Sequence, residues 1–233
     1  MKVIIKKGEK INKNIIKGLE KIDENIVACI GGDGTILYAL KHFNKPCLLI
    51  RLPNKKSLGF RGDTTIENLK AIEEKIRKKE FYKEQFKKIE VIQQNKKIEV
   101  FNDVVIFRRV AKEIGIEIIE ENEKVLEFFG DGVIITSSFG CTAYNFKANG
   151  PITKEKDILI ITPINSNIKN SYITKKELKV FITKGKAKLE IDGENFGNVK
   201  EIKVNLSKKT FEIVKLKGFE ESFSSKINRI IVR

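Results

Sequence analysis

The sequence has no tryptophan, one histidine and three cysteines among its 233 residues. Cys29, Cys47 and Cys141 are odd in number and far apart, which argues against a disulfide framework and against a CxxC metal site. With His42 as the only histidine, a nucleophilic triad that depends on histidine is excluded. Every uncharged apolar run is too short for a signal peptide or a membrane-spanning helix. We therefore expect a soluble, cytoplasmic protein in a reducing compartment, without a membrane partner.

Positive charge is in excess, with 46 Lys and Arg residues against 31 Asp and Glu residues and a net charge of +15. So basic a protein attracts polyanions, which include both nucleic acids and nucleotide substrates. The basic residues are scattered among acidic ones, without an arginine-rich arm, zinc-finger spacing or an aromatic RNA-binding signature. We expect a generally basic surface and no specific nucleic-acid partner. A hydrophobic content of 41% is ample for the core of one large or two modest domains.

The stretch from Ile26 to Leu40 organises the functional argument. Residues 26–30 are apolar and largely β-branched without alternation, which is typical of a strand covered on both faces in a parallel sheet. The sequence GGDGT follows at 31–35, and Thr35 is placed to cap a helix whose apolar residues recur at helical spacing over 36–43. Unpaired amides and the helix dipole favour an anion at such a turn, and phosphate is the obvious candidate.

Asp33 is the unexpected residue of this loop, because a carboxylate among amides repels a phosphate unless it has chemistry to perform. It could hold a magnesium ion or accept the proton of an attacking hydroxyl group. The alternative is a tight turn, in which the glycines supply positive φ and Asp33 caps the helix. The loop matches neither the Rossmann fingerprint nor the Walker pattern.

Residues 1–84 predict a small α/β domain with a parallel sheet. Apolar runs at 3–5, 26–30 and 47–50 alternate with helical patterns, so ligands are expected at the carboxyl ends of the strands. Thr64 and Glu67 predict a capping box for a helix that continues to residue 76.

Residues 85–218 predict a β-rich, sandwich-like domain, with one helix near 141–147. The tail at 219–233 is expected to form a helix and a strand that return to the first domain. The strand-like runs lie at 86–93, 97–107, 114–120, 124–136, 157–162, 178–183, 188–192, 199–205 and 211–216.

Three further stretches carry polar residues where strands should end. Asn102 and Asp103 lie inside an apolar run, where two polar side chains are costly unless something satisfies them, although a β-bulge or a hairpin bend also accounts for them. A strand over 130–136 is followed by a Ser- and Gly-rich turn and a helix start at 137–144, which is a second possible polar-ligand site. Asp192 with Gly193, taken alone, reads as a turn.

The order of these motifs resembles that of the NAD kinase family. GGDGT alone also occurs in diacylglycerol and sphingosine kinases, and phosphofructokinases have a similar loop, so the second long motif with TAY selects the family. The loop at 54–60, NKKSLGF, matches a family loop, except that Lys56 stands where glycine is usual. The matching motifs are GGDGT at 31–35, NDVVI at 102–106, DGVIITSSFGCTAY at 131–144, NGPI at 149–152, ITPI at 161–164 and DG at 192–193.

The resemblance implies transfer of the γ-phosphoryl group of ATP, or of polyphosphate, to the 2′-hydroxyl of the adenosine ribose of NAD, giving NADP. It also implies Mg²⁺ or another divalent cation, without assigned protein ligands, and a homo-oligomer, either a dimer or a tetramer. Such chemistry needs mainly positioning and charge neutralisation, with one base to orient the hydroxyl. By the same resemblance, Asp33 is the catalytic base and contacts NAD with Gly34, the phosphate path is lined by Gly31, Gly32, Gly34 and Thr35, ribose hydroxyls bind Asn102 and Asp103, and the NAD nucleoside is held by Asp131, Thr142, Ala143 and Tyr144.

Two other functions remain open from the sequence. One is a lipid or sugar kinase that shares GGDGT, although a lipid kinase should need an apolar entry surface and none is readable. The other is a basic polyanion-binding module without catalysis, which would not need Asp33.

Overall fold

The computed structural model describes residues 1–53 and 59–232 of the chain. By its internal contacts the chain divides into two compact units, Met1–Gln85 with Phe211–Arg233, and Phe86–Thr210. The sequence-based ranges were 1–84, 85–218 and 219–233, so residues 211–218 group here with the first unit. The expected fold class is confirmed, since the first unit has a parallel sheet with helices and the second is built of antiparallel strands.

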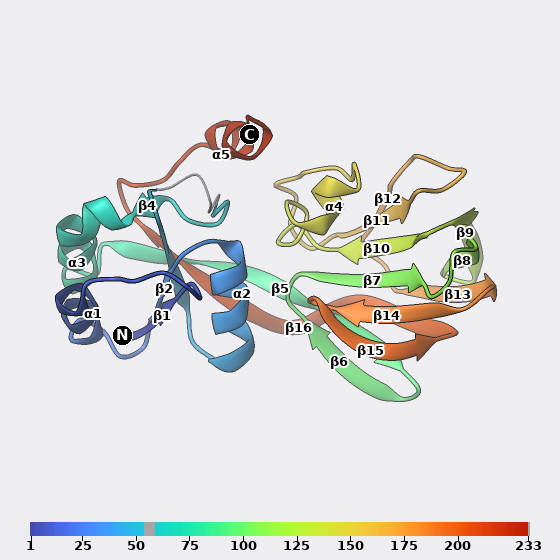
Figure 1. The fold of residues 1–233 in the computed structure, drawn as a ribbon, viewed down its shortest axis with the longest axis horizontal. Coiled ribbons are helices and arrows are strands. Elements are labelled where there is room, and N and C mark those ends of the chain that lie inside the picture. The colour runs from blue at the N-terminus through green and yellow to red at the C-terminus, as the bar shows by residue number, and fades with distance from the viewer. Residues whose placement is uncertain (54–58, 233) are drawn as a thin grey trace. The chain divides into compact units, whose positions relative to one another are not determined.

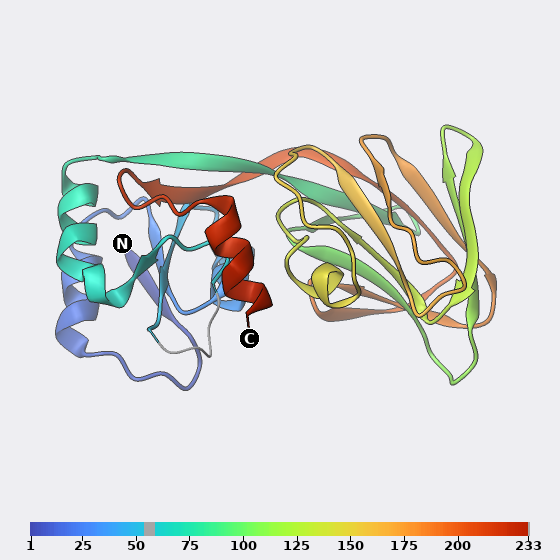
Figure 2. The same ribbon diagram turned by 90° about the horizontal axis from the view of Figure 1, so that it is seen from above.

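The first unit is a parallel sheet with helices on both faces (Figure 1). Strands pair in parallel in the order β1-β2-β3, β4 extends β3, and β16 joins β3 in parallel through Ile213 and Cys47. Figure 2 shows the same arrangement from above, with α1 and α3 together on one side of the strands. The elements are β1 (Lys2–Ile5), α1 (Lys13–Glu20), β2 (Val27–Ile30), α2 (Asp33–His42), β3 (Cys47–Arg51), β4 (Thr64–Thr65), the 3₁₀ turn η1 (Ile66–Asn68), α3 (Leu69–Arg77) and α5 (Phe223–Ile231), with the ends of β5 (Phe81–Gln93) and β16 (Glu201–Leu216).

Burial on both faces explains the continuous apolar runs of the central strands, because every residue of β2 is buried. Leu19 of α1 and Ile72 of α3 belong to one apolar cluster with Ile30 and Ile50 of the sheet. On α2, Ile36 and its buried neighbours cover the other face. The GGDGT loop is thereby fixed at the carboxyl end of a buried strand.

The second unit is a sandwich of two antiparallel sheets. One has the strand order β12-β11-β10-β7-β14-β15, and the other contains β16-β13-β8-β9 with β5 and β6. Alternate residues of both sheets, such as Ile106, Ile135 and Ile116, share one core cluster. The elements are β6 (Lys96–Val100), β7 (Asp103–Arg108), β8 (Ile114–Glu120), β9 (Glu123–Gly130), β10 (Gly132–Thr136), α4 (Tyr144–Lys147), β11 (Leu159–Ile164), β12 (Tyr172–Thr174), β13 (Leu178–Lys184), β14 (Ala187–Ile191) and β15 (Glu194–Val199).

Several local predictions are wrong in detail. The capping box uses Thr65 and Asn68 rather than Thr64 and Glu67. The runs at 97–107 and 124–136 each form two strands, because the chain bends at 101–102 and at Asp131. Most of the run at 199–205 and the run at 211–216 belong instead to one continuous strand, β16. The tail forms the helix α5 without the expected strand among the described residues. Asn54 and Lys56 of the predicted NKKSLGF loop lie outside the described residues.

All three cysteines are free and buried. With ten residues, α2 is the longest helix in the described parts of the chain. Accordingly, no helix in 1–53 or 59–232 is both long and apolar enough to cross a membrane.

Candidate functional site

The GGDGT loop turns the chain from β2 into α2. The amide of Gly31 donates to the carbonyl of Ile50 on the neighbouring strand, at an N···O distance of 2.9 Å. The helix α2 begins at Asp33, with Gly32 at the N-cap position, so the prediction that Thr35 caps the helix is wrong. Amides in the first turn of a helix have no partner within the helix and, together with the dipole, favour an anion. The turn therefore has the geometry of a phosphate-binding loop.

Gly31 and Gly34, the glycines at the two ends of the GGDG segment, serve different purposes. A Cβ atom at Gly31 would lie 2.3 Å from the hydroxyl oxygen of Thr35 and 2.9 Å from the Cβ of Lys6, so only glycine fits there. A Cβ atom at Gly34 would meet nothing within 4 Å. The first turn of α2 is thus open at Gly34, which is exposed.

The carboxylate of Asp33 binds the backbone of a distant loop. Its two oxygens accept hydrogen bonds from the amides of Phe60 and Arg61, at 2.8 and 3.0 Å. The alternative in which Asp33 caps α2 is therefore not what the structure shows. Because a carboxylate offers about four acceptor positions, two remain for a ligand hydroxyl or a cation.

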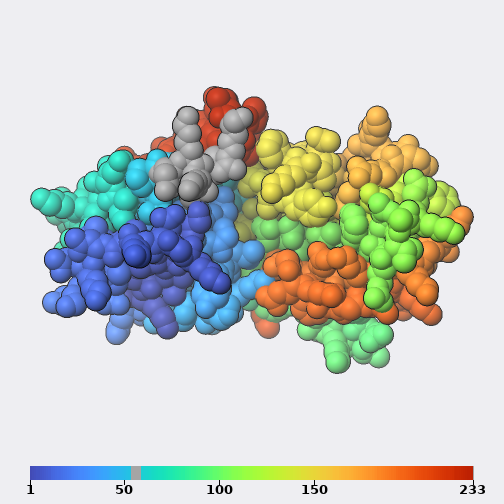
Figure 3. Space-filling model, viewed as in Figure 1, coloured from blue at the N-terminus to red at the C-terminus, as the bar shows by residue number. Residues whose placement is uncertain are grey.

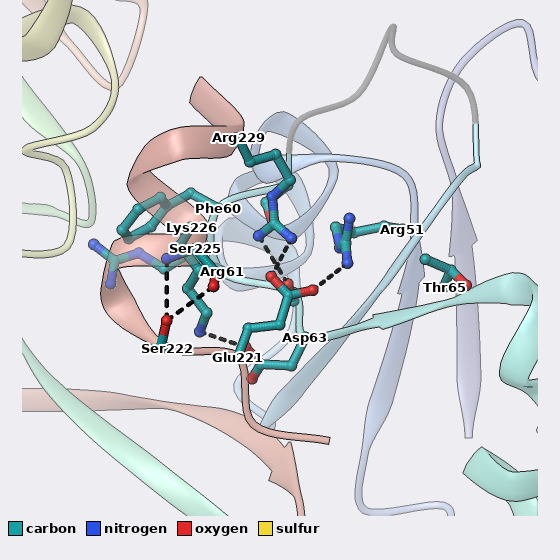
Figure 4. Close-up of polar contacts among 12 residues, drawn as sticks. Arg51, Phe60, Arg61, Asp63, Thr65, Glu221, Ser222, Ser225, Lys226 and Arg229 are labelled. Carbon is teal, nitrogen blue, oxygen red and sulfur yellow. Dashed lines mark hydrogen bonds and ion pairs between the residues drawn. The ribbon is translucent and has the colours of Figure 1, made fainter. Parts of the chain in front are cut away.

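The segment that binds Asp33 is held from its other side by buried charges, shown in Figure 4. Asp63 forms ion pairs with Lys215, at 2.8 Å, and with Lys226 of α5, and its side chain is 5% exposed. The ammonium group of Lys215 also donates to the carbonyl oxygen of Arg61, at 2.7 Å. One lysine thus contacts both Asp63 and the residue whose amide binds Asp33.

Burial changes the protonation of this ion pair. It lowers the pKa of Lys215 from the ordinary 10.5 to about 8, against the opposing effect of the Asp63 carboxylate, and Lys226 lowers it further. Burial alone would raise the pKa of Asp63, but Lys215 and Lys226 together hold it below its usual value. The carboxylate therefore stays ionised, and Lys215 loses its proton at a lower pH than an ordinary lysine.

In the second unit, Asp192 organises the backbone of the NDVVI motif. Its carboxylate accepts hydrogen bonds from three successive amides, those of Phe101, Asn102 and Asp103, at 3.0, 2.7 and 3.2 Å. Asp192 and Gly193 both have positive φ, +49° and +79°, as in a type I′ hairpin turn between β14 and β15. The hairpin, orange in Figure 3, lies at the surface of this unit. Asp192 is consequently both a turn residue and an anchor.

Asn102 and Asp103 lie at the bend between β6 and β7. The Asn102 side-chain amide donates to the Asp103 carboxylate at 2.8 Å, and Asp103 is 6% exposed. The carbonyl of Asn102 accepts from the hydroxyl of Thr136, at 2.6 Å, and a Cβ atom at Gly140 would lie 2.1 Å from that carbonyl. The bend and the Ser- and Gly-rich turn are therefore packed against each other.

Asp131 lies between β9 and β10 and is held by two side chains. Arg108 forms an ion pair with its carboxylate at 2.6 Å, and the side-chain amide of Asn165 donates to it at 3.0 Å. The first contact pairs the carboxylate with a positive charge, and the second is a hydrogen bond that fixes its direction. Asp131 is thus oriented before any ligand arrives.

The helix start after the Ser- and Gly-rich turn presents the last predicted residues. Thr142 and Ala143 are half-buried, and Tyr144, the first residue of α4, is 39% exposed. Burial raises the pKa of the Tyr144 phenol, and the nearby charges of Glu190, Asp103 and Asp131 raise it further. The structure therefore brings Tyr144 into the electrostatic neighbourhood of two other predicted residues.

A buried polar network behind α4 was missed by the sequence analysis. Asn145 is fully buried, and its side-chain amide donates to the carbonyls of Cys141 and Pro151, at 3.1 and 2.9 Å. Its side-chain oxygen accepts from the hydroxyl of Thr162, at 2.7 Å. The network fixes both ends of the segment that carries Thr142, Ala143 and Tyr144.

The predicted residues thus form two groups, each within one unit. The first unit brings together Gly31, Gly32, Asp33, Gly34 and Thr35 at one loop. In the second unit, Asn102 and Asp103 are joined by a hydrogen bond. Tyr144 lies close enough to Asp103 and Asp131 for their charges to act on its phenol. Over residues 1–53 and 59–232, no three His, Cys, Asp or Glu side chains gather in a way that could hold a metal ion.

Sequence reasoning missed the groups that hold these residues in place. The Asp-Gly pair at 192–193 carried a signal as part of the motif order, and Phe60 lies in the loop that resembles the family's but had no role assigned. Most of the others carried no local signal, because their contacts join residues that are far apart in sequence; Asn145, by contrast, binds residues only four and six positions away. The missed residues are Phe60, Arg61, Asp63, Arg108, Asn145, Asn165, Lys215, Glu221, Lys226 and Arg229.

Comparison with known proteins identifies the family. No family model matches the chain. A curated NAD kinase of Campylobacter lari, strain RM2100, is 32% identical over 235 residues, which cover 94% of this chain and 81% of the relative. The chain belongs to the NAD kinase family.

Solved structures of NAD kinase and NADH kinase share the fold. A crystal structure of an NAD kinase from Archaeoglobus fulgidus in complex with ATP has a TM-score of 0.79 at 21% identity and covers 98% of this chain and 97% of its own. Yeast NADH kinase complexed with NADH has a TM-score of 0.76 at 20% identity and covers 89% of this chain and 67% of its own. The α/β unit and the β-sandwich unit are therefore those of the NAD kinase fold.

The lowered pKa of Lys215 predicts a pH-dependent stability. Between about pH 8 and pH 10.5 the unfolded chain binds the Lys215 proton and the folded chain does not, so this group makes the free energy of unfolding rise with pH. The slope reaches at most about 1.4 kcal/mol per pH unit. Urea unfolding of wild type and Lys215→Met across this range measures it, and the difference between the two proteins should change with pH. A difference that is constant over the range contradicts the lowered pKa.

Proposed function

We propose that the chain transfers the γ-phosphoryl group of ATP to the 2′-hydroxyl of the adenosine ribose of NAD, producing NADP and ADP. The reaction breaks the bond between the γ-phosphorus and the bridging oxygen of ATP and forms a bond from the same phosphorus to the ribose oxygen. The hydroxyl proton goes to a base. The observation that carries the proposal is the Asp33 carboxylate at the first residue of α2, beside amides that suit a phosphate.

The first unit offers both groups that such a transfer needs. The exposed, uncrowded Gly34 leaves room for an anion beside the start of α2, where helix amides favour one. Asp33 keeps acceptor positions beyond its two backbone hydrogen bonds, so it is suited to orient the hydroxyl and take its proton. Gly31, Gly32 and Thr35 complete the proposed phosphate loop.

The second unit offers groups that suit a nucleoside. Asn102 and Asp103 are proposed to bind ribose hydroxyls, since their backbone is fixed by Asp192 and carboxylate and amide oxygens accept from hydroxyls. Asp131 is proposed to hold the nucleoside together with the half-exposed Tyr144. Thr142 and Ala143 form the rest of this proposed surface.

The protein groups present suit a divalent cation that is bound mainly through the phosphates of the nucleotide. The described residues offer no cluster of three metal-binding side chains, and Mg²⁺ is commonly bound through substrate phosphates with one or two carboxylates. Asp33 is the carboxylate that the GGDGT loop offers. When bound, the ion would neutralise charge on the transferred phosphate. The relative crystallised with ATP supports ATP as the donor.

The proposal also includes a homo-oligomer, either a dimer or a tetramer, and a cytoplasmic location. Three free, buried thiols suit a reducing compartment. Polyphosphate is retained as a second possible donor.

The test of the function is the production of NADP from NAD, ATP and Mg²⁺, with Asp33→Asn as the informative variant. General-base assistance is typically worth about 10²- to 10⁴-fold, so turnover should fall by that factor. The carboxamide keeps an acceptor oxygen but turns an NH₂ group toward one of the two amides, so a small loss of thermal stability is expected as well.

The matched control is Asp23→Asn, because Asp23 also accepts a backbone amide, that of Asn25, but at an exposed turn of the same unit. Its turnover should equal that of wild type. Absence of NADP with wild type, using either ATP or polyphosphate, would contradict the function. A loss below tenfold in Asp33→Asn would remove its role as the base.

A second prediction separates ligand binding from scaffolding at the NDVVI motif. Asn102→Ala keeps the backbone amide that Asp192 binds and removes only the side chain, so its effect reports mainly on ligand binding. Asp103→Ala leaves a cavity at a buried position, so this variant should also have a lower thermal midpoint. A lost hydrogen bond to a ribose hydroxyl should raise the KM for NAD roughly 2- to 10-fold. The KM for ATP should change less. The measurements are NAD and ATP kinetics with the thermal midpoint.

Asn195→Ala is the control for this pair, since Asn195 lies in the same unit and its side chain caps the exposed amide of Gly197. It should leave both Michaelis constants unchanged. If Asn102→Ala melts early but uses NAD as well as wild type does, the residue belongs to the scaffold.

A further inference from the structure

We propose that Asp63, held between Lys215 and Lys226, is a positioning residue for Asp33, and that α5 thereby sets the direction of the catalytic carboxylate. The inference rests on the proposed function of Asp33 as the base. It assigns a role to the carboxyl-terminal helix α5, which lies outside all of the recognised motifs.

The connection runs through four contacts within the first unit. Lys226 of α5 and Lys215 of β16 both bind the carboxylate of Asp63. Lys215 binds the carbonyl of Arg61 as well, at 2.7 Å. The amide of Arg61 then donates to Asp33, at 3.0 Å. Since these contacts fix both faces of one residue, a shift of Asp63 moves the amide that aims Asp33.

A second set of contacts from α5 holds the other end of the same loop. Arg229 donates to the carbonyls of Gly59 and Gly62, both at 3.2 Å. Glu221 forms ion pairs with Arg229 and with Arg51 of β3, as Figure 4 shows. The loop from Gly59 to Asp63 is therefore held at both ends by α5 and the strands beneath it.

The beginning of α5 is itself fixed, which makes it a suitable support. The hydroxyl of Ser222 accepts from the amide of Ser225, at 3.1 Å, as an N-cap. The ring of Phe223 packs edge-on against Phe60, with centroids 5.8 Å apart. The residue after the N-cap thus contacts the residue whose amide also binds Asp33.

Stability alone does not account for this arrangement. Buried ion pairs are often replaced by apolar residues with no loss of stability, because desolvation offsets the attraction between the charges. Lys215 illustrates that cost, since burial lowers its pKa well below the ordinary value. The two lysines also hold the loop, since Lys215 donates hydrogen bonds to both Asp63 and the carbonyl of Arg61 while Lys226 pairs with the other oxygen of Asp63.

The informative variant is Lys226→Met, which removes the contact from α5 but leaves Lys215 to neutralise Asp63. Because small misplacements of catalytic groups cost up to about 10²-fold, kcat should fall roughly 10- to 100-fold, with little change in the KM for ATP or the thermal midpoint. Lys226→Arg retains a cation and should restore most of kcat. Asp63→Asn should reproduce the kcat loss with a larger loss of stability, because it leaves two buried lysines without a carboxylate.

The matched control is Lys75→Met, which breaks an ion pair with Glu80 at 2.5 Å in the same unit but away from the loop. It should keep the kcat of wild type. A kcat loss in Lys75→Met as large as in Lys226→Met would mean that any lost ion pair has this effect and would overturn the inference.

Amide hydrogen exchange at Phe60 and Arg61 gives a readout that does not depend on activity. Both amides should exchange faster in Lys226→Met and in Asp33→Asn, and remain protected in Lys75→Met. Unchanged exchange together with unchanged kcat in Lys226→Met overturns the inference while the proposed function stands. If wild type makes no NADP, the proposed function fails and with it the catalytic role, while the exchange still reports whether α5 holds the loop.

Discussion

A half-buried carboxylate that accepts hydrogen bonds from successive backbone amides is the interaction on which both candidate ligand sites depend. Asp33 binds the amides of residues 60 and 61, and Asp192 binds those of residues 101, 102 and 103. A hydrogen bond to a charged acceptor is stronger than a neutral one, and an amide buried without a partner is costly. Each carboxylate therefore fixes a loop that regular secondary structure leaves unpaired. A loop fixed in this way can present a polar group without first paying for its ordering when a ligand binds.

The parts of the fold that sequence predicted are those with a local cause. The buried strand at 26–30 and the glycines after it are adjacent in sequence, so apolar pattern and turn chemistry indicated both. The strand β16 was predicted as two, because Ser207 and the lysines that follow it interrupt the apolar pattern. β16 pairs with β13 at residues 201–204 and with β3 at Ile213, on either side of that polar stretch, and it also pairs with β5. Pairing between distant segments is not encoded in a short window.

The same reasoning explains what the sequence revealed of the candidate site. Asp33 was recognisable because a carboxylate in a phosphate loop contradicts local electrostatics. The residues that hold it were not, since Asp63 and Lys215 are separated by 152 positions and neither is unusual where it stands. Asp192 was an intermediate case, because the Asp-Gly pair marked the hairpin turn but its three side-chain hydrogen bonds span about 90 residues. Motifs therefore pointed to the groups proposed to face the ligands and missed the residues that hold them in place.

The supports in the two units differ in the kind of group they use, and this has a physical consequence. Behind α4, Asn145 uses neutral hydrogen bonds that are all satisfied, which orders the segment at little electrostatic cost. In the first unit, the loop is held by buried charges. Their burial costs desolvation free energy, and their attraction depends on their protonation states. Under the proposed function an anionic phosphate approaches Asp33 and repels its carboxylate, so the loop amides that bind Asp33 need to be held firmly against that repulsion. Hydrogen bonds and ion pairs between charged groups are stronger than neutral hydrogen bonds, so they suit this task better.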